Sequence, residues 1–203
     1  MTGKSHLITA ASTAVIADTG FKLISDFIKK QDLFTACRNY VTCGIAEDIS
    51  FEGVVMLFIC AFLFFIGSVL PDIDSEKSAF GKYARLPVKH RTFTHSVFFI
   101  TPFLILGIFL WRPLLWLSFG MISHLFCDSF SKAGVCWFWP LSGYKNYDSG
   151  AFVKKGYHLK LYGTGEWSEY LWVAVSVVIA LFLIIKAYII PMLTQGINPV
   201  FVY

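Results

Sequence analysis

Long apolar stretches are the feature that most limits how this chain can fold. An α-helix needs roughly 20 mostly apolar residues to cross the hydrocarbon core of a bilayer. Three stretches meet this requirement, at residues 51–70, 93–111 and 170–190. A fourth run, 113–130, is shorter and follows Trp111-Arg112-Pro113, which is typical of a tight turn with Pro starting the next helix. We therefore expect 93–130 to form a helical hairpin that crosses the membrane and returns.

Composition agrees with a membrane protein. Hydrophobic residues make up 56% of the chain and charged residues 15%, against about 45–50% and 25% in soluble domains. With no repeat or linker, the sequence predicts one domain over residues 1–203, an all-α polytopic membrane bundle of about four to five membrane helices with interfacial loops. Segment 6–21 is short and rich in Ala and Thr, so it either spans or packs at the membrane face. Residues 22–50 are expected to form a short surface helix and a loop.

The basic residues predict the orientation of this bundle. Loops 71–92 and 128–169 lie on one side of the predicted membrane and hold ten Lys and Arg, whereas the turn and the tail opposite hold only Arg112. The excess of positive charge in cytoplasmic loops places the first side in the cytoplasm. The net charge of +4 and the lack of a basic patch predict no nucleic-acid partner, and the sequence names no protein partner. Cys37 and Cys43 form a disulfide only if their stretch faces an oxidising compartment.

Polar residues gather on this cytoplasmic side of the predicted bundle. Each lies at or just beyond the end of an apolar run, and His6 joins them if segment 6–21 spans. Ionisable groups near membrane depth are costly and generally have a partner or a function. The set comprises His6, Asp72, Asp74, His90, His95, His124, Asp128, Glu166 and Glu169.

Imidazole and carboxylate together are typical ligands of Zn, Mn or Fe. His124 and Asp128 are four residues apart, so a helix places both on one face. His90 and His95 are five apart and share an ion only if His90 lies in the preceding loop. The number of ligands predicts two ions that share a carboxylate. Each residue also has a simpler reading, as a helix cap, an interfacial group or a structural hydrogen bond, and only the convergence favours a metal.

Four motifs carry a family resemblance, in an order and spacing that match over about residues 4–170: GSVLPDIDS, HRTFTHS, GMISHLFCDSFSKAGVCWFWPL and GTGEWSE. They resemble the YdjM family of bacterial inner-membrane proteins, described as LexA-regulated, metal-dependent hydrolases and similar to zinc-dependent phospholipase C and P1 nuclease. Ser75 departs from the pattern, because many relatives have His there. The resemblance implies one to three divalent ions, most readily Zn with Mn as an alternative, held by His6, Asp72, His90, His124, Asp128 and Glu169.

The expected activity is metal-dependent hydrolysis of a phosphoester in a phospholipid or lipid-linked substrate. Asp74 is the candidate general base and His95 the candidate acid, although both are alternatively ligands or groups that support ligands. Arg91 or Lys89 is expected to clamp the phosphoryl oxygens. A regulatory or binding membrane protein with a structural metal site is the alternative, and a transporter with an ion relay is a third reading. The clustering at one face argues against transport, since a relay should reach the midplane.

Overall fold

A computed structural model describes residues 2–28, 51–76, 78, 80–84, 86–88, 90–141 and 159–190. This part of the chain is helical and contains no strand; Ser131 and Tyr162 form an isolated bridge. The α-helices are α1 (Gly3–Ile28), α3 (Phe51–Val69), α4 (Val97–Phe109), α5 (Leu114–Ser129) and α6 (Trp167–Ile184). Short 3-10 turns η1 (Leu70–Asp74) and η2 (Phe93–His95) follow α3 and precede α4, and a π-helical turn, η3 (Ile185–Ile189), extends α6. The predicted Cys37–Cys43 pair lies outside the described residues.

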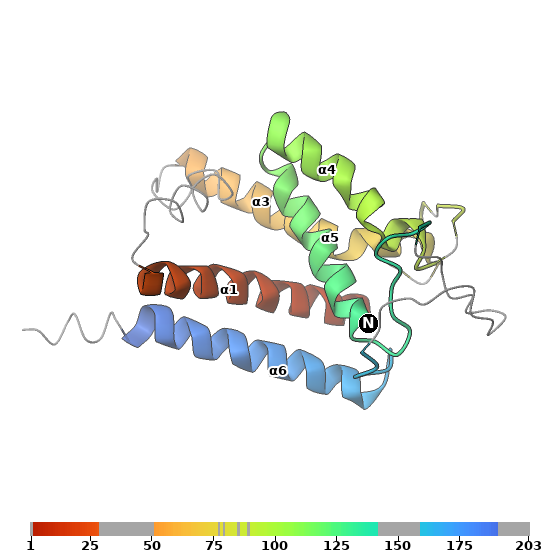
Figure 1. Ribbon diagram of the computed structural model, residues 1–203. Coiled ribbons are helices and arrows are strands. Elements are labelled where there is room, and N and C mark those ends of the chain that lie inside the picture. Colours follow the sequence, from red (N-terminus) through yellow and green to blue (C-terminus); the bar gives the residue numbers. More distant parts are fainter. Residues whose placement is uncertain are drawn as a thin grey trace, which may run out of the picture.

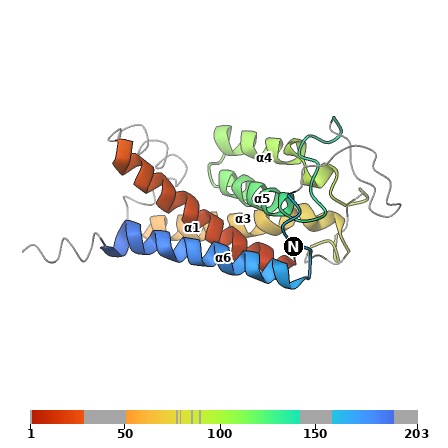
Figure 2. The same ribbon diagram turned by 60° about the horizontal axis from the view of Figure 1, so that its bottom comes forward.

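The helices form two packed groups that meet at one end of the bundle (Figure 1). Helix α1 lies along α6, and α3 packs against α5, which forms a hairpin with α4. Figure 2 shows that the first turns of α1 and α6 lie close together beneath the end of α5. This arrangement brings the start of α1 and the ends of α3 and α5 to the same end of the molecule.

Glycines allow α3 and α5 to touch through their backbones. A Cβ placed on Gly120 would lie 2.1 Å from the carbonyl oxygen of Phe64, and one on Gly67 would lie 2.1 Å from that of Leu117. Small residues at such crossings are typical of membrane helices, because close backbone approach replaces the hydrophobic driving force. The contact fixes the height of α5 relative to the end of α3.

Helix α1 buries hydroxyl groups without leaving them unpaired. Thr9 donates to the carbonyl of Ser5 at 2.8 Å, Ser12 to Ile8 at 3.0 Å and Thr13 to Thr9 at 2.7 Å. Because each hydroxyl is satisfied within its own helix, the small polar face of α1 can pack in the bundle. This explains how an Ala- and Thr-rich segment forms a helix that packs along α6.

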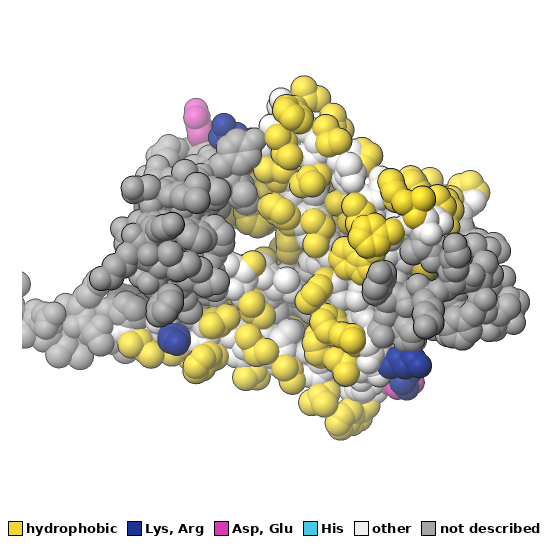
Figure 3. Space-filling view, in the orientation of Figure 1, with side chains coloured by type: hydrophobic (Ala, Val, Ile, Leu, Met, Phe, Trp, Pro, Cys, Tyr) yellow, Lys and Arg dark blue, Asp and Glu magenta, His cyan; other side chains and the backbone are white. Residues whose placement is uncertain are grey.

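The outward faces of the bundle are apolar. On α3, Phe51, Phe58 and Phe62 are exposed. On α6, the exposed apolar side chains include Trp167, Leu171, Val175, Val178 and Phe182. Hydrophobic side chains also cover much of the described surface in the view of Figure 3. A soluble helix turns its apolar stripe inward, whereas these helices turn theirs outward, as expected of surfaces that contact lipid.

Helix lengths differ from the sequence prediction in two places. Only α3 with η1 and α6 are both long and apolar enough to cross a membrane among the described helices. The predicted span 93–111 is shorter than expected, because residues 93–95 form η2 and α4 has 13 residues, a length of about 20 Å. Residues 22–28 continue α1 rather than starting a separate surface helix. The turn at Trp111-Arg112-Pro113 is confirmed, since α5 begins at Leu114.

Candidate metal centre

The predicted polar residues converge at the end of the bundle where α1 starts and α3 and α5 finish. His6 comes from the first turns of α1, and Asp72 and Asp74 come from η1. His90 lies in the turn before η2, as the prediction required, and His95 ends η2. His124 and Asp128 come from the last two turns of α5. Four chain segments that are far apart in sequence therefore build one cluster.

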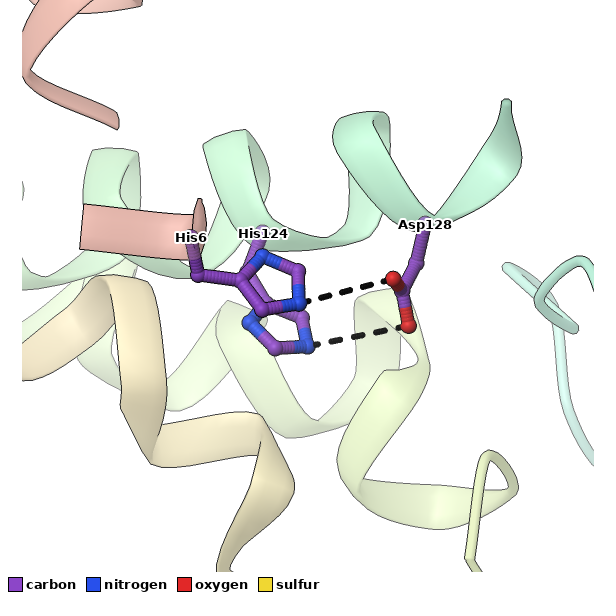
Figure 4. A group of neighbouring side chains, drawn as sticks. All are labelled: His6, His124 and Asp128. Carbon is purple, nitrogen blue, oxygen red and sulfur yellow. Dashed lines mark ion pairs between the residues drawn. The ribbon is translucent and has the colours of Figure 1, made fainter. Parts of the chain in front are cut away.

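His6, His124 and Asp128 form the first part of this cluster (Figure 4). The two imidazole rings stack with their centroids 3.9 Å apart and their planes inclined by 16°. His6 Nε2 lies 3.5 Å from Asp128 Oδ1, and His124 Nε2 lies 3.9 Å from Asp128 Oδ2. All three side chains are buried. The spacing of four residues on α5 places His124 and Asp128 toward the same point, as predicted.

Asp72, His95 and His124 form a tighter triangle beside it. His95 Nε2 and His124 Nε2 are 3.2 Å apart, and they lie 3.4 and 3.5 Å from Asp72 Oδ1. Two atoms that share a tetrahedral Zn²⁺ at about 2.0–2.1 Å are separated by about 3.3–3.4 Å. The three edges match this separation, so these atoms are spaced like corners of one tetrahedral site. Asp128 Oδ2 lies 3.9 Å from both imidazole nitrogens.

A second group consists of Asp72, His90 and His95, with ligand atoms within 4.8 Å of one another. It shares Asp72 and His95 with the triangle that includes His124. Asp72 and His95 therefore lie between the ligands contributed by α1 and α5 and the ligand contributed by the turn at His90. Among the described carboxylates, Asp72 belongs both to the triangle with His95 and His124 and to the group with His90 and His95.

The Nδ1 atoms of His90 and His124 are held by hydrogen bonds. His124 Nδ1 donates to the carbonyl of Ser68 at 2.7 Å, and His90 Nδ1 lies 2.6 Å from Asp74 Oδ1. Such a bond fixes the ring and leaves Nε2 as the ligand atom, which is the usual support of metal-binding histidines. Both side chains are therefore oriented for coordination through Nε2.

Asp74 is the support for several neighbours. Besides His90, it accepts the Thr94 hydroxyl at 2.5 Å and the backbone N–H of Arg91 at 3.2 Å, and its side chain is buried. Thr94 in turn lies 3.1 Å from His95 Nδ1. Both oxygens of Asp74 are therefore engaged with neighbouring side chains and backbone of the cluster.

Arg91 connects the cluster to the loop after α5. Its Nη2 lies 3.1 Å from Asp128 Oδ2, and its Nη1 donates to Ser131 Oγ at 3.2 Å and to the carbonyl of Gly134 at 3.1 Å. Its φ of +64° is unusual for a residue with a side chain. The bond from its N–H to Asp74 helps to hold this backbone conformation.

Glu169 is hydrogen-bonded to backbone N–H groups at the starts of α1 and α6. Its Oε1 accepts the N–H of Thr2 and its Oε2 the N–H of Gly165, each at 2.7 Å. Neither group of candidate ligands among the described residues includes it. Glu166, the alternative considered from sequence, is exposed and pairs with Lys132 at 2.7 Å.

The donor set fits a divalent cation. Nitrogen and oxygen ligands in this number suit Zn or Mn. The strongest indication of a bound cation comes from His6, because both of its ring nitrogens are buried and have no hydrogen-bond partner. Buried polar atoms without a partner cost free energy unless a ligand binds them. Although burial disfavours the charged imidazole of His95, hydrogen bonds to Asp72 and Asp74 raise its pKa to about 9.

Sequence reasoning missed three supporting groups. The Ser68 carbonyl, the Thr94 hydroxyl and the Ser131 hydroxyl hold His124, Asp74 and Arg91. Thr94 lies between the two histidines of HRTFTHS, and only this position in the motif could have indicated its role from the sequence. The Ser68 carbonyl has no signal, because every residue carries one.

Comparison with known proteins places the chain in a family. The model of the YdjM inner membrane protein family matches residues 1–193. No curated protein and no solved structure gives a significant match. Since the match covers nearly all of the 203 residues, the chain belongs to the YdjM family of inner membrane proteins.

Proposed function

We propose that this protein is a membrane-bound, metal-dependent hydrolase that cleaves a phosphoester in a phospholipid or lipid-linked substrate. The observation that carries the proposal is the set of imidazole nitrogens and carboxylate oxygens spaced like ligands of one ion, together with the two buried ring nitrogens of His6, which have no hydrogen-bond partner. His6, Asp72, His95, His124 and Asp128 are the residues that we expect to hold the ions. His90 completes the second group.

Unequal burial favours a catalytic over a structural site. The side chains of His6, His95, His124 and Asp128 are at most 1% exposed, whereas those of His90 and Asp72 are 42% and 17% exposed. Structural zinc sites are closed, whereas catalytic sites keep a position for water or substrate. The side of the cluster formed by His90 and Asp72 is where we expect the substrate to approach.

The residues divide the chemistry among them. A bound divalent ion of this type lowers the pKa of a water ligand and polarises a phosphoryl oxygen. We assign Asp74 to the orientation of His90 and His95, because its oxygens already accept three hydrogen bonds. His95, the candidate acid from sequence, is instead assigned as a ligand, because its Nε2 belongs to the triangle with Asp72 and His124. Arg91 neutralises Asp128 and lies within the cluster, where a phosphoryl group would meet its positive charge. Lys89 lies outside the described residues.

The membrane part of the proposal comprises four to five membrane helices in the bacterial inner membrane, with the cluster facing the cytoplasm. The apolar outward faces of α3, α4 and α6 support it, as does the excess of Lys and Arg in the loops on the cluster's side. A cluster at the end of the helices lies at the depth of lipid head groups. This placement favours a substrate with a polar head and a chain in the bilayer.

The test begins with elemental analysis of the protein purified in detergent. We expect Zn or Mn in the wild type and less in His124→Ala and Asp128→Ala, with Lys132→Ala as the surface control. The metal-loaded protein should then hydrolyse a phosphodiester reporter or phospholipids in mixed micelles, and both variants should not. Metal retention without hydrolysis of any ester would favour the regulatory alternative. Equal metal content in the wild type and both variants would refute the ligand assignment.

A further inference from the structure

We propose that Glu169 is a positioning residue, which holds the start of α1 so that His6 reaches the metal centre, and that it is not itself a ligand. This inference rests on the proposed function, because it concerns how one ligand of that centre is placed. It replaces the role that the family resemblance implies for Glu169.

The first observation is how completely Glu169 is engaged. Its side chain is fully buried in the first turn of α6. One oxygen accepts the N–H of Thr2 and the other the N–H of Gly165, each at 2.7 Å, and the side chain of Ser5 contributes a further hydrogen bond. Three hydrogen bonds therefore occupy most of the roughly four lone-pair sites of this carboxylate.

The second observation is the direct path from Glu169 to His6. Thr2 precedes α1, and its carbonyl accepts the N–H of His6 at 3.0 Å, which is the first hydrogen bond of the helix. The Thr2 hydroxyl lies 2.8 Å from that of Ser5 and also accepts the Ser5 N–H at 3.4 Å. Glu169 therefore fixes both the residue that caps α1 and the turn that carries His6.

The third observation is that His6 lacks the support that other histidines have. His90 and His124 are oriented by hydrogen bonds at Nδ1, whereas neither nitrogen of His6 has one. Its ring stacks on His124, with the centroids 3.9 Å apart, and its Nε2 lies 3.5 Å from Asp128 Oδ1. Since stacking permits sliding, the backbone of α1 also determines where Nε2 lies, and the hydrogen bond from Thr2 to Glu169 anchors the start of this backbone to α6.

A double-mutant cycle on metal affinity tests the proposal in the full-length protein. Zn²⁺ affinity is measured by competition with a chelator for the wild type, Glu169→Gln, His6→Ala and the double variant. Glu166→Gln is the matched control, because it makes the same change three residues earlier, on the exposed side. We expect Glu169→Gln to lower the affinity about 10- to 100-fold, the range for groups that support ligands, and the control to leave it unchanged.

The double variant separates a positioning residue from a ligand. If Glu169 acts through His6, adding Glu169→Gln to His6→Ala costs no more than about twofold in affinity. The melting temperature of the metal-free protein should still fall with Glu169→Gln in both backgrounds, which separates positioning from general stability. A further loss of tenfold or more would make Glu169 a ligand, and an unchanged affinity in the single variant would also overturn the proposal.

A second pair of variants covers failure of Glu169→Gln to fold. Thr2→Pro removes the N–H that Glu169 accepts and keeps the carboxylate, whereas Thr2→Ala keeps that N–H. We expect weaker Zn²⁺ binding in the first than in the second, and equal binding would contradict the proposal. If the wild type binds no Zn²⁺, the proposed function fails as well. If the wild type binds Zn²⁺, but Glu169→Gln either leaves the affinity unchanged or adds its full loss to that of His6→Ala, only the positioning role is overturned.

Discussion

Replacement of Gly120 by Ala tests the packing that supports His124. In most helices Gly→Ala is stabilising by roughly 0.5–1 kcal/mol, because Gly loses more conformational entropy on folding. Here the added Cβ would lie 2.1 Å from the Phe64 carbonyl oxygen and 2.8 Å from the amide nitrogen of Ser68. Both are backbone atoms, so no side chain can move aside. We therefore expect Gly120→Ala to destabilise the protein.

The size of the effect follows from the distances. An ordinary contact at about 3.4 Å would require α3 and α5 to separate by about 1.3 Å, and overpacking of this kind costs about 1–3 kcal/mol. The same shift would lengthen the bond from His124 Nδ1 to the Ser68 carbonyl, now 2.7 Å, to about 4 Å, beyond hydrogen-bonding distance. Loss of this support should reduce metal affinity about 10- to 100-fold.

The assay combines thermal unfolding in detergent with Zn²⁺ competition. Gly3→Ala is the matched control, because its Cβ meets nothing within 4 Å, and we expect it to be neutral or slightly stabilising. A Gly120→Ala protein that melts at or above the wild-type temperature would refute the backbone contact between α3 and α5. A variant that is destabilised but keeps full affinity would show that the Ser68 carbonyl does not support His124.

Three further predictions concern the same centre. Asp74→Asn should weaken Zn²⁺ binding about 10- to 100-fold, because the NH₂ group of Asn cannot accept the hydrogen bonds that His90, Arg91 and Thr94 donate to the carboxylate. Chelator competition measures the affinity, and unchanged binding would contradict the supporting role of Asp74. Because the pKa of His95 in the metal-free protein is about 9, its imidazole is charged at pH 7 and must lose a proton to bind metal; affinity measured from pH 6 to 9 should therefore rise toward the upper limit, and a flat profile would exclude His95 as a ligand. Lys132→Ala removes an exposed ion pair with Glu166 and should leave metal content and melting temperature unchanged, whereas a large loss would place this pair within the centre.

The sequence predicted the parts of this fold that depend on local pattern. The apolar run at 51–70 became α3, and the Pro113 turn joined α4 to α5. His124 and Asp128 point to one place because a helix repeats every 3.6 residues. The loop position of His90 was also derivable, because that residue precedes the apolar run.

The remaining features depend on tertiary contacts that no local pattern carries. Helix α4 is shorter than its apolar run because η2 turns His95 inward and the N–H of Val97 bonds to the Trp137 carbonyl at 2.8 Å. Spacing alone did not distinguish whether Glu169 points at the centre or at Thr2, because both lie at the same end of the bundle. Hydrogen-bond geometry decides between them, and it becomes visible only when α1 is docked on α6.

The wide separation of the donors along the chain sets an order of events during synthesis. His6 leaves the ribosome first, but its partners on α5 emerge more than a hundred residues later, and Glu169 emerges later still. The other proposed ligands of His6 are therefore not yet made when the N-terminal segment is synthesised. The proposed function then implies that the cation is loaded late, into the finished bundle rather than into a fragment.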